Sequence, residues 1–363
     1  MSLKNKVLFI TGASRGIGLA IALRAAQDGA KVAIAAKTVN AHEKLPGTIH
    51  TAAEAIVAAG GEAIAIACDV RDEEQIKAAI AKTVETFGGI DIVINNAGAI
   101  QLTNTENTDM KRFDLMQSVN ARAVFMTVKH ALPHLKKSAN AHVINLSPPL
   151  NLDPDWFAPH LGYTLSKYGM SLCTLGLAQE FKSAGIAVNS LWPETAIDTS
   201  AIRNLMGDVQ ESFQAARKPE IVADAAYWIL TQPAASCTGN FFIDSVVLTA
   251  AGEKDLGKYA VDPNAKPLPD FFLGKPPKQM PKKKAPVKDA EVATEKAPAV
   301  IASPALAPAE ATPAPKTDTI VSAVEQKSDL TVAPVVVATP AAKTCGDAGK
   351  KKCCGGGCHK KKK

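Results

Sequence analysis

Apolar residues show two different spacings along the chain as far as Ile243. Short runs of consecutive apolar, often β-branched residues are typical of strands buried on both faces. They predict strands at Lys6–Ile10, Lys31–Ala36, Ala63–Cys68, Asp91–Asn95, His142–Leu146, Ala187–Leu191 and Asn240–Ile243. Between them, apolar residues three or four positions apart indicate helices with one buried face. These helices are predicted at Ile17–Asp28, Glu73–Phe87, Lys111–Leu132, Thr164–Ser183 and Glu220–Leu230.

This strand–helix alternation predicts an α/β fold, a doubly wound parallel sheet of the Rossmann type with about seven strands in a single domain. Such sheets bind their ligands outside the carboxyl ends of the strands. Polar residues stand at the carboxyl ends of several predicted strands: Thr11, Lys37, Asp69, Asn95 and Ser147. We therefore expect a ligand site at this edge of the sheet.

Composition changes at Pro276. Residues 276–363 hold no aromatic residue, 11 of the 23 prolines, and 16 lysines against 8 acidic residues. Their net charge of +8, set against +6 for the whole chain, leaves −2 for residues 1–275. Segments rich in Ala, Pro and Lys bury too little apolar surface to offset the entropy of ordering. We predict a folded domain at 1–275, a disordered linker at 276–344 and a Cys- and Lys-rich tail at 345–363.

The tail gathers four cysteines and a histidine, Cys345, Cys353, Cys354, Cys358 and His359. Thiolates and imidazole are good zinc or copper ligands, but the spacing lacks the paired knuckles of zinc modules. A flexible basic terminus is the alternative, and we assign no metal-site residue. The lysine runs at 282–284 and 360–363 predict salt-sensitive contacts with phosphates. Without aromatic residues for base stacking, we expect no specific nucleic-acid partner.

We expect a cytoplasmic protein without a membrane span. The apolar run Val7–Ile10 is too short for a signal peptide, and no run approaches the length of a membrane helix. Cys68, Cys173 and Cys237 stand singly in apolar surroundings, which fits reduced thiols better than a disulfide framework. The terminal lysines also differ from the Ser-Lys-Leu peroxisomal address.

A glycine-rich turn, Thr11-Gly-Ala-Ser-Arg-Gly-Ile-Gly18, joins the first predicted strand to the first predicted helix. In this position, its main-chain N–H groups and the helix N-terminus are predicted to bind the pyrophosphate of a dinucleotide. A glycine pattern alone is weak evidence, and its place between strand and helix strengthens it. The candidate cofactor residues in the turn are Gly12, Ser14, Arg15, Gly16, Ile17 and Gly18.

The end of the second strand favours NADP over NAD. An acidic residue there binds the ribose 2′-hydroxyl of NAD, whereas a cation accommodates the 2′-phosphate of NADP. This strand is followed by Lys37, and Arg15 offers a guanidinium group suited to phosphate. The alternative is that both are ordinary solvated cations, which would leave NAD as the cofactor.

Tyr163 and Lys167 lie four positions apart in a predicted helix, so they share one face. An ammonium group beside a phenol lowers the pKa of the phenol, which then serves as a proton shuttle. By itself, a tyrosine four positions before a lysine often occurs on a helix by chance. Downstream of a dinucleotide turn, it predicts a catalytic pair.

Together with these residues, the segments Cys68-Asp69-Val70, Asn95-Asn-Ala-Gly98, Asn120 and Ser147 form an ordered signature. The chain resembles the short-chain dehydrogenase/reductase family from residue 4 to about residue 250. Further segments, Lys44–Ile49, Ser147–Leu152, Trp192–Ile197 and Pro269–Leu273, resemble one branch of the family whose members continue into a sterol-carrier lipid-binding module. We expect the Lys/Pro/Ala-rich tail to replace that module here.

The resemblance implies a role for each matching residue. Asp69 holds the adenine amino group, and the run that includes Asn96, Ala97 and Gly98 binds adenosine. Tyr163 exchanges the substrate proton, Lys167 binds the nicotinamide ribose and lowers the tyrosine pKa, and Asn120 anchors a water of the proton relay. Pro193 flanks the nicotinamide, and Thr195 or Thr199 contacts its carboxamide.

Two positions depart from the family pattern. The usual catalytic serine is the second of a Ser-Ser pair, and here the pair reads Ser147-Pro148. Either Ser147 polarises the substrate carbonyl through a shifted loop, or that contribution is lost, at a cost on the order of 100-fold in turnover. Where the family has a Pro-Gly pair, this chain has Pro193-Glu194. The Glu194 carboxylate is expected either near the opening of the cofactor site or exposed to solvent.

Two segments are candidates for substrate contacts. Ser200–Phe213 is in the position of the substrate lid, where Ile202, Leu205, Met206 and Phe213 either line an apolar pocket or simply pack. Trp156, Phe157 and His160 stand in the loop before the catalytic helix, and we expect them to pack the loop.

The sequence therefore predicts an NADP-dependent oxidoreductase that acts on a carbonyl or alcohol of an apolar, lipid-, fatty acyl- or steroid-like small molecule. The lipid part rests on the resemblance. The alternative is an NADP-binding redox sensor or scaffold with little turnover, whose tail is an interaction module. The resemblance also implies a homo-oligomer paired through the helices at Lys111–Leu132 and Thr164–Ser183.

Overall fold

The computed structural model describes residues 1–41, 46–200, 202–203 and 213–275. Their strands form one seven-stranded sheet in the order β3-β2-β1-β4-β5-β6-β7, with every neighbouring pair parallel. The strands are β1 (Val7–Thr11), β2 (Lys31–Ala36), β3 (Glu62–Ala67), β4 (Ile92–Asn95), β5 (His142–Asn145), β6 (Ala187–Trp192) and β7 (Phe241–Ile243). The predicted doubly wound fold is confirmed.

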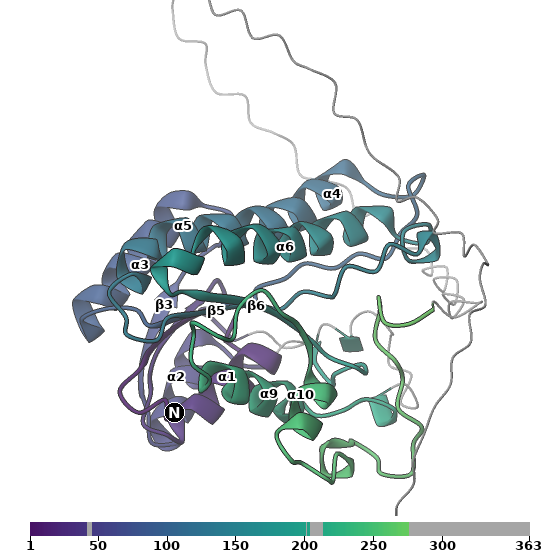
Figure 1. The fold of residues 1–363 in the computed structure, drawn as a ribbon. Coiled ribbons are helices and arrows are strands. Elements are labelled where there is room, and N and C mark those ends of the chain that lie inside the picture. The colour runs from purple at the N-terminus through teal and green to yellow at the C-terminus, as the bar shows by residue number, and fades with distance from the viewer. Residues whose placement is uncertain (42–45, 201, 204–212, 276–363) are drawn as a thin grey trace, which may run out of the picture. The chain divides into compact units, whose positions relative to one another are not determined.

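Helices cover both faces of the sheet (Figure 1). One layer contains α1 (Gly16–Ala26), α2 (Ile49–Ala58), α9 (Glu220–Leu230) and α10 (Asp244–Ala250). The other contains α3 (Glu73–Phe87), α4 (Met110–Met116), α5 (Ala123–Leu135) and α6 (Leu161–Glu180). The described residues also form 3₁₀ turns at η2 (Pro154–Trp156), η3 (Lys182–Ala184) and η4 (Gly257–Tyr259). No helix in the described ranges is long and apolar enough to cross a membrane.

Strand β1 shows why the strands read as unbroken apolar runs. Leu8 and Ile10 join the core beneath α1, α2 and α9, whereas Val7 and Phe9 join the core beneath α3, α5 and α6. All four are at most 4% exposed. Burying one such side chain contributes about 1.5–3 kcal/mol, so both helical layers are held to the sheet by alternate residues of the same strands.

The helix predicted at Lys111–Leu132 is not continuous. Between α4 and α5 the backbone forms the π-helical turn η1 (Gln117–Arg122), which contains Asn120. The Asn120 side chain bonds to both the N–H and the carbonyl of Ala99, so the turn is fixed from outside the helix. Apolar spacing carries no signal for such a contact.

Within the described ranges, the prediction missed the helices α2 and α10. Helix α2 begins at a capping box in which the Thr48 and Thr51 side chains each bond to the other's main-chain N–H. The usual box has Glu or Gln in the second position, so this version is harder to recognise. Helix α10, Asp244–Ala250, follows β7 with no intervening loop.

The segment after α10 returns to the carboxyl edge of the sheet. The N–H of Ala196 donates to Leu268 O at 2.8 Å, and the N–H of Asp270 donates to Glu194 O at 3.0 Å. Phe272 is fully buried, and its ring lies 5.3–6.2 Å from those of Trp156, His160, Tyr163, Tyr168 and Trp192. A separate aromatic core therefore holds this segment against the rest of the domain.

We predict that Phe272→Ala lowers the free energy of unfolding by about 3–5 kcal/mol, because it leaves a cavity at the centre of the aromatic core. Equilibrium urea denaturation measures the change. Leu152→Ala is the control, since Leu152 is 75% exposed, and a change within about 0.5 kcal/mol is expected there. Equal effects of the two substitutions would contradict a stabilising role for Phe272.

Candidate active site

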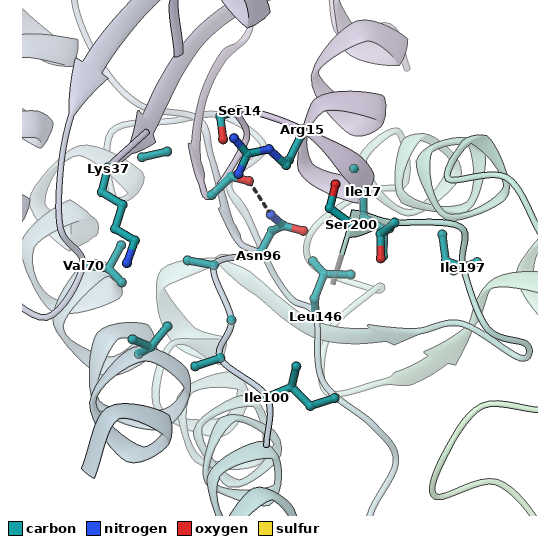
Figure 2. Close-up of a pocket in the computed structure, with 18 of the residues that line it drawn as sticks. Ser14, Arg15, Ile17, Lys37, Val70, Asn96, Ile100, Leu146, Ile197 and Ser200 are labelled. Atoms are coloured by element: carbon teal, nitrogen blue, oxygen red, sulfur yellow. Dashed lines mark hydrogen bonds between the residues drawn. The ribbon is translucent and has the colours of Figure 1, made fainter. Parts of the chain in front are cut away.

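A cavity of about 490 Å³ opens at the carboxyl edge of the sheet. Figure 2 shows Lys37 and Val70 on one side of it and Ile197 and Ser200 on the other, with Asn96 between them. The cavity brings together most of the sequence-predicted residues: Gly12, Ser14, Arg15, Gly16, Ile17, Lys37, Asp69, Asn96, Ala97, Gly98, Tyr163, Lys167 and Pro193. Gly18, Asn120, Ser147 and Thr195 are not among its lining residues.

The glycine turn after β1 is pressed against the end of β4. Asn96 Nδ2 donates to the carbonyls of Thr11 and Gly12 at 3.0 and 3.1 Å. A Cβ at Gly18 would lie 2.5 Å from Asn96 Nδ2, and one at Gly12 would lie 2.9 Å from Ala97 Cα. Gly12 also has a φ of +70°, which disfavours any side chain. Gly18 thus belongs to the wall behind the turn, although it does not line the cavity.

The turn leads into α1, whose first turn carries no side-chain cap. A helix N-terminus of this kind presents main-chain N–H groups and a partial positive charge to the cavity, the usual environment for a phosphate. The Arg15 guanidinium donates to the carbonyls of Pro46 and Gly47 at 2.9 and 2.6 Å. Burial lowers the pKa of Arg15.

The far side of the cavity carries several charges. Lys37 is exposed at the end of β2. Asp69 is paired with Arg71, whose guanidinium contacts both carboxylate oxygens, and this hydrogen bonding holds the pKa of Asp69 below its usual value. Arg71 also lines the cavity and was missed in the sequence, where its only signal is a position two residues after Asp69.

Tyr163 and Lys167 lie on α6 and are 5% and 7% exposed. Lys167 Nζ donates to Leu146 O at 2.6 Å and stands 5.0 Å from the centre of the Trp192 ring. Burial lowers the pKa of Lys167 to about 8. The sequence predicted that Lys167 lowers the pKa of Tyr163. In this structure, however, burial raises the pKa of Tyr163, and the Asp270 carboxylate adds to the increase.

Asn120 is fully buried behind the cavity. Its Oδ1 accepts the N–H of Ala99 at 2.8 Å, and its Nδ2 donates to Ala99 O at 2.9 Å and to Ser166 Oγ at 2.8 Å. Ser166 Oγ in turn donates to Tyr163 O. The visible effect of Asn120 is to fix the 98–100 loop and the first turns of α6 to one another.

Ser147 is fully buried, does not line the cavity and belongs to a chain of hydrogen-bonded polar side chains. Its Oγ lies 2.8 Å from Ser190 Oγ, which lies 2.8 Å from Thr174 Oγ1. The chain continues through Asn145 to Asn95, again with distances of 2.8 Å. The structure therefore does not bring the Ser147 hydroxyl to Tyr163.

After β6, Pro193 lines the cavity, and so does Thr199. Thr195 is buried, and its Oγ1 has no hydrogen-bond partner among the described residues. Glu194 is not simply solvated, because its carboxylate accepts from Arg217 Nη1 at 3.0 Å. That ion pair directs the Glu194 charge toward Arg217.

Of the predicted lid, Ile202 lines the cavity, Phe213 lies beneath the guanidinium of Arg203, and Leu205 and Met206 fall outside the described residues. In the loop before α6, Trp156 and His160 pack against Phe271 and Phe272, and Phe157 packs against Tyr168. The expectation that this loop is held by its own aromatic residues is confirmed. The tail with its cysteines also lies outside the described residues.

Asp270 and Phe271 line the cavity and were not predicted as site residues. Burial raises the pKa of Asp270 to about 7; the charge of Asp244 acts in the same direction, and that of Lys167 opposes it. Their segment follows the last strand, where the sequence carries no strand–helix signal. Only the resemblance of Pro269–Leu273 to one branch of the family marked it.

Comparison with known proteins agrees with this geometry. The family model for short chain dehydrogenases matches residues 6–208. The chain is 58% identical over 273 residues to hydroxysteroid dehydrogenase-like protein 2 of Xenopus tropicalis. A crystal structure from Xanthomonas campestris, provisionally described as a dehydrogenase, has 58% identity and a TM-score of 0.73, and the match covers 76% of this chain and 100% of that one.

A more distant structural neighbour was solved with a cofactor. This metagenomic short-chain oxidoreductase in complex with NADP is 27% identical, with a TM-score of 0.55 over 67% of this chain and 98% of its own. The match to the Xenopus protein covers 75% of this chain and 64% of that relative. The chain thus spans between about half and two thirds of the length of the curated relatives it matches.

Proposed function

The chain belongs to the short-chain dehydrogenase family, and from that premise we propose that it is an NADP-dependent oxidoreductase that transfers hydride between nicotinamide and a carbonyl or alcohol group of an apolar substrate. One observation carries the proposal. A single cavity is lined at one end by the glycine turn and elsewhere by Tyr163 and Lys167. A phosphate-binding turn and a proton-exchanging group in one cavity are what hydride transfer to a carbonyl requires.

The residues present fit a dinucleotide. Gly12 and Gly18 leave room where any side chain would collide with Asn96 or Ala97, so the turn can approach a pyrophosphate closely. We propose that Ser14, Gly16 and Ile17 contribute main-chain contacts there, and that Asp69 and the residues Asn96–Gly98 bind adenosine. When bound, the nicotinamide would supply or accept the hydride.

The proton would be handled by Tyr163. In reduction, its phenolic proton passes to the substrate oxygen as the hydride reaches the carbonyl carbon, and in oxidation both movements reverse. Lys167, with a pKa of about 8, is mostly charged at neutral pH and would bind the nicotinamide ribose. Pro193 and Thr195 would flank the nicotinamide, and Asn120 would anchor the water of the relay.

The hydrogen bond between Ser147 and Ser190 supports the second alternative for Ser147, in which its hydroxyl does not polarise the substrate carbonyl. We propose that the serine contribution to carbonyl polarisation is lost, and that turnover is lower by on the order of 100-fold than with that donor in place. The retained pair of Tyr163 and Lys167 supports an enzyme over the alternative of a redox sensor or scaffold.

The lining supports an apolar substrate. Ile100, Leu146, Ile197, Ile202 and Phe271 present hydrocarbon or aromatic surface to the cavity. Apolar surface of this kind favours substrates with an extended hydrocarbon part. We propose a lipid-, fatty acyl- or steroid-like carbonyl or alcohol, in keeping with the name of the Xenopus relative.

Exposed apolar side chains on α5 and α6 support a homo-oligomer. Leu165, Leu172 and Leu175 on α6 and Phe125 on α5 are 45–57% exposed. The two helices cover the same face of the sheet (Figure 1). The spacing of the α6 residues places them on one side of the helix, where a second copy of the chain would bury them.

Tyr163→Phe is expected to lower kcat/KM for ketone reduction by about 100-fold or more, because it removes the proton donor. NADPH oxidation across a panel of ketones and acyl substrates measures this, and fluorescence titration should show unchanged NADPH binding. Tyr227→Phe makes the same chemical change outside the cavity and should leave the rate nearly unchanged. If the wild type binds NADPH yet reduces no substrate faster than Tyr163→Phe does, the redox sensor or scaffold replaces the enzyme as the proposed function.

Lys37→Asp is expected to lower the preference for NADPH over NADH by about tenfold or more, because a carboxylate there repels a 2′-phosphate and accepts from a 2′-hydroxyl. The ratio of kcat/KM for the two cofactors measures the preference. Lys111→Asp, at an exposed position on α4, controls for the change in total charge. An unchanged ratio would mean that Lys37 is only a solvated cation.

Leu172→Arg is expected to shift sedimentation velocity from an oligomer to a smaller species, because the charge would be buried between copies. Val57→Arg is the control, since Val57 is 56% exposed on α2, which belongs to the other helical layer. A wild-type protein that sediments as a monomer at micromolar concentration would overturn the oligomer proposal.

A further inference from the structure

We propose that Asp270 is a positioning residue of this active site: its carboxyl group sets the charge that faces Tyr163 and Lys167, and thereby the direction of catalysis favoured near neutral pH. The inference rests on the proposed function. It concerns a residue about one hundred positions downstream of the pair on which it acts. Its support is the placement of Asp270, which backbone contacts and aromatic packing fix beside the cavity.

The backbone of Asp270 is fixed beside the stretch that follows β6. Its N–H donates to Glu194 O at 3.0 Å, and Pro269 forms an antiparallel bridge with Thr195. Asp270 Oδ1 accepts the N–H of Phe271 at 2.7 Å. The carboxyl group is thereby held at the cavity, which Asp270 lines together with Tyr163, Lys167, Trp192 and Pro193.

The next two residues hold the carboxyl group in place. Trp192 Nε1 donates to Phe271 O at 3.0 Å. Phe272 is fully buried, and its ring is stacked on that of Tyr163 with a centroid distance of 6.2 Å and an interplanar angle of 27°. Phe272, two residues after Asp270, thus anchors this segment in the aromatic core. The charge and the phenol are therefore parts of one packed unit.

Several groups face Asp270. Tyr163 and Lys167 come from α6, Asp244 lies at the start of α10, and Glu194 is paired with Arg217. Burial raises the pKa of Asp244 to about 6, while burial lowers the pKa of His160 in the neighbouring loop. His160 is thus neutral near pH 7, and Lys167 on α6 is the cation whose charge lowers the pKa of Asp270. With a pKa of about 7, Asp270 changes charge within the neutral range.

The sign of the effect follows from Coulomb interactions. A carboxylate at position 270 opposes a second negative charge on Tyr163, so it favours the protonated phenol, and it favours the ammonium form of Lys167. Reduction needs a protonated phenol, because Tyr163 gives its proton to the substrate oxygen. Oxidation needs the phenolate, which takes that proton back. An ionised Asp270 therefore favours reduction.

Asp270→Asn tests this inference with little structural change, since the amide keeps an oxygen that accepts the N–H of Phe271. The pH at which reduction declines on the alkaline side, and the pH at which oxidation rises, should both move down by about one unit. The same steady-state profiles for Asp262→Asn, an acid of the same segment that does not line the cavity, should match the wild type.

A second measurement does not depend on turnover. The ¹³Cε NMR signal of Lys167, assigned by its loss in Lys167→Arg, reports the titration of the ammonium group. Its midpoint should fall in Asp270→Asn by about one pH unit, because the substitution removes the carboxylate that favours the ammonium form of Lys167. Thermal unfolding of both variants shows whether the fold is retained.

The outcomes separate the two proposals. A shifted Lys167 titration in a protein without turnover would overturn the proposed function, and only the electrostatic effect of Asp270 on Lys167 would stand. Turnover with unshifted profiles and an unshifted Lys167 titration would overturn the role of Asp270 alone. A loss of stability in Asp270→Asn without any shift would show that the residue serves only the packing of its segment, and this result would also overturn the inference.

Discussion

The close approach of the β1 turn to the end of β4 is the constraint on which the site depends. β1 and β4 are neighbours at the point where the strand order reverses, and Asn96 Nδ2 bonds to the carbonyls of both Thr11 and Gly12. Only glycine fits at positions 12 and 18 at this distance. The contact between these two central strand ends therefore also shapes the end of the cavity at the glycine turn.

The opposite end of the cavity is held by different forces. Buried polar groups link the strand ends, from Asn95 through Asn145 and Thr174 to Ser190 and Ser147. Aromatic packing around Phe272 then holds the last described segment against α6. Each polar partner would be costly to remove singly, because the others would stay buried without it. Tyr163 and Lys167 are thus positioned from both sides.

Burial shifts the two pKa values of the pair in opposite directions. It raises the pKa of Tyr163 and lowers that of Lys167, so it disfavours the ionised form of each group. The Asp270 carboxylate adds to the first effect and opposes the second. The protonation of Tyr163 and Lys167 therefore depends on which charges the segment after α10 brings to the cavity. In our proposal, this segment supplies the charge that sets the preferred direction of hydride transfer.

The sequence by itself determined the parallel sheet, the glycine turn and the residues at the strand ends, because each follows from local spacing that the fold preserves. Only the tertiary structure decided the π-helical turn at Asn120, the inward bond of Ser147 and the place of Asp270. Each of these depends on a contact with a residue distant in the chain: Ala99 for Asn120, Ser190 for Ser147 and Glu194 for Asp270. The periodicity of a segment describes which of its faces is buried, but carries no information about the partner that buries it.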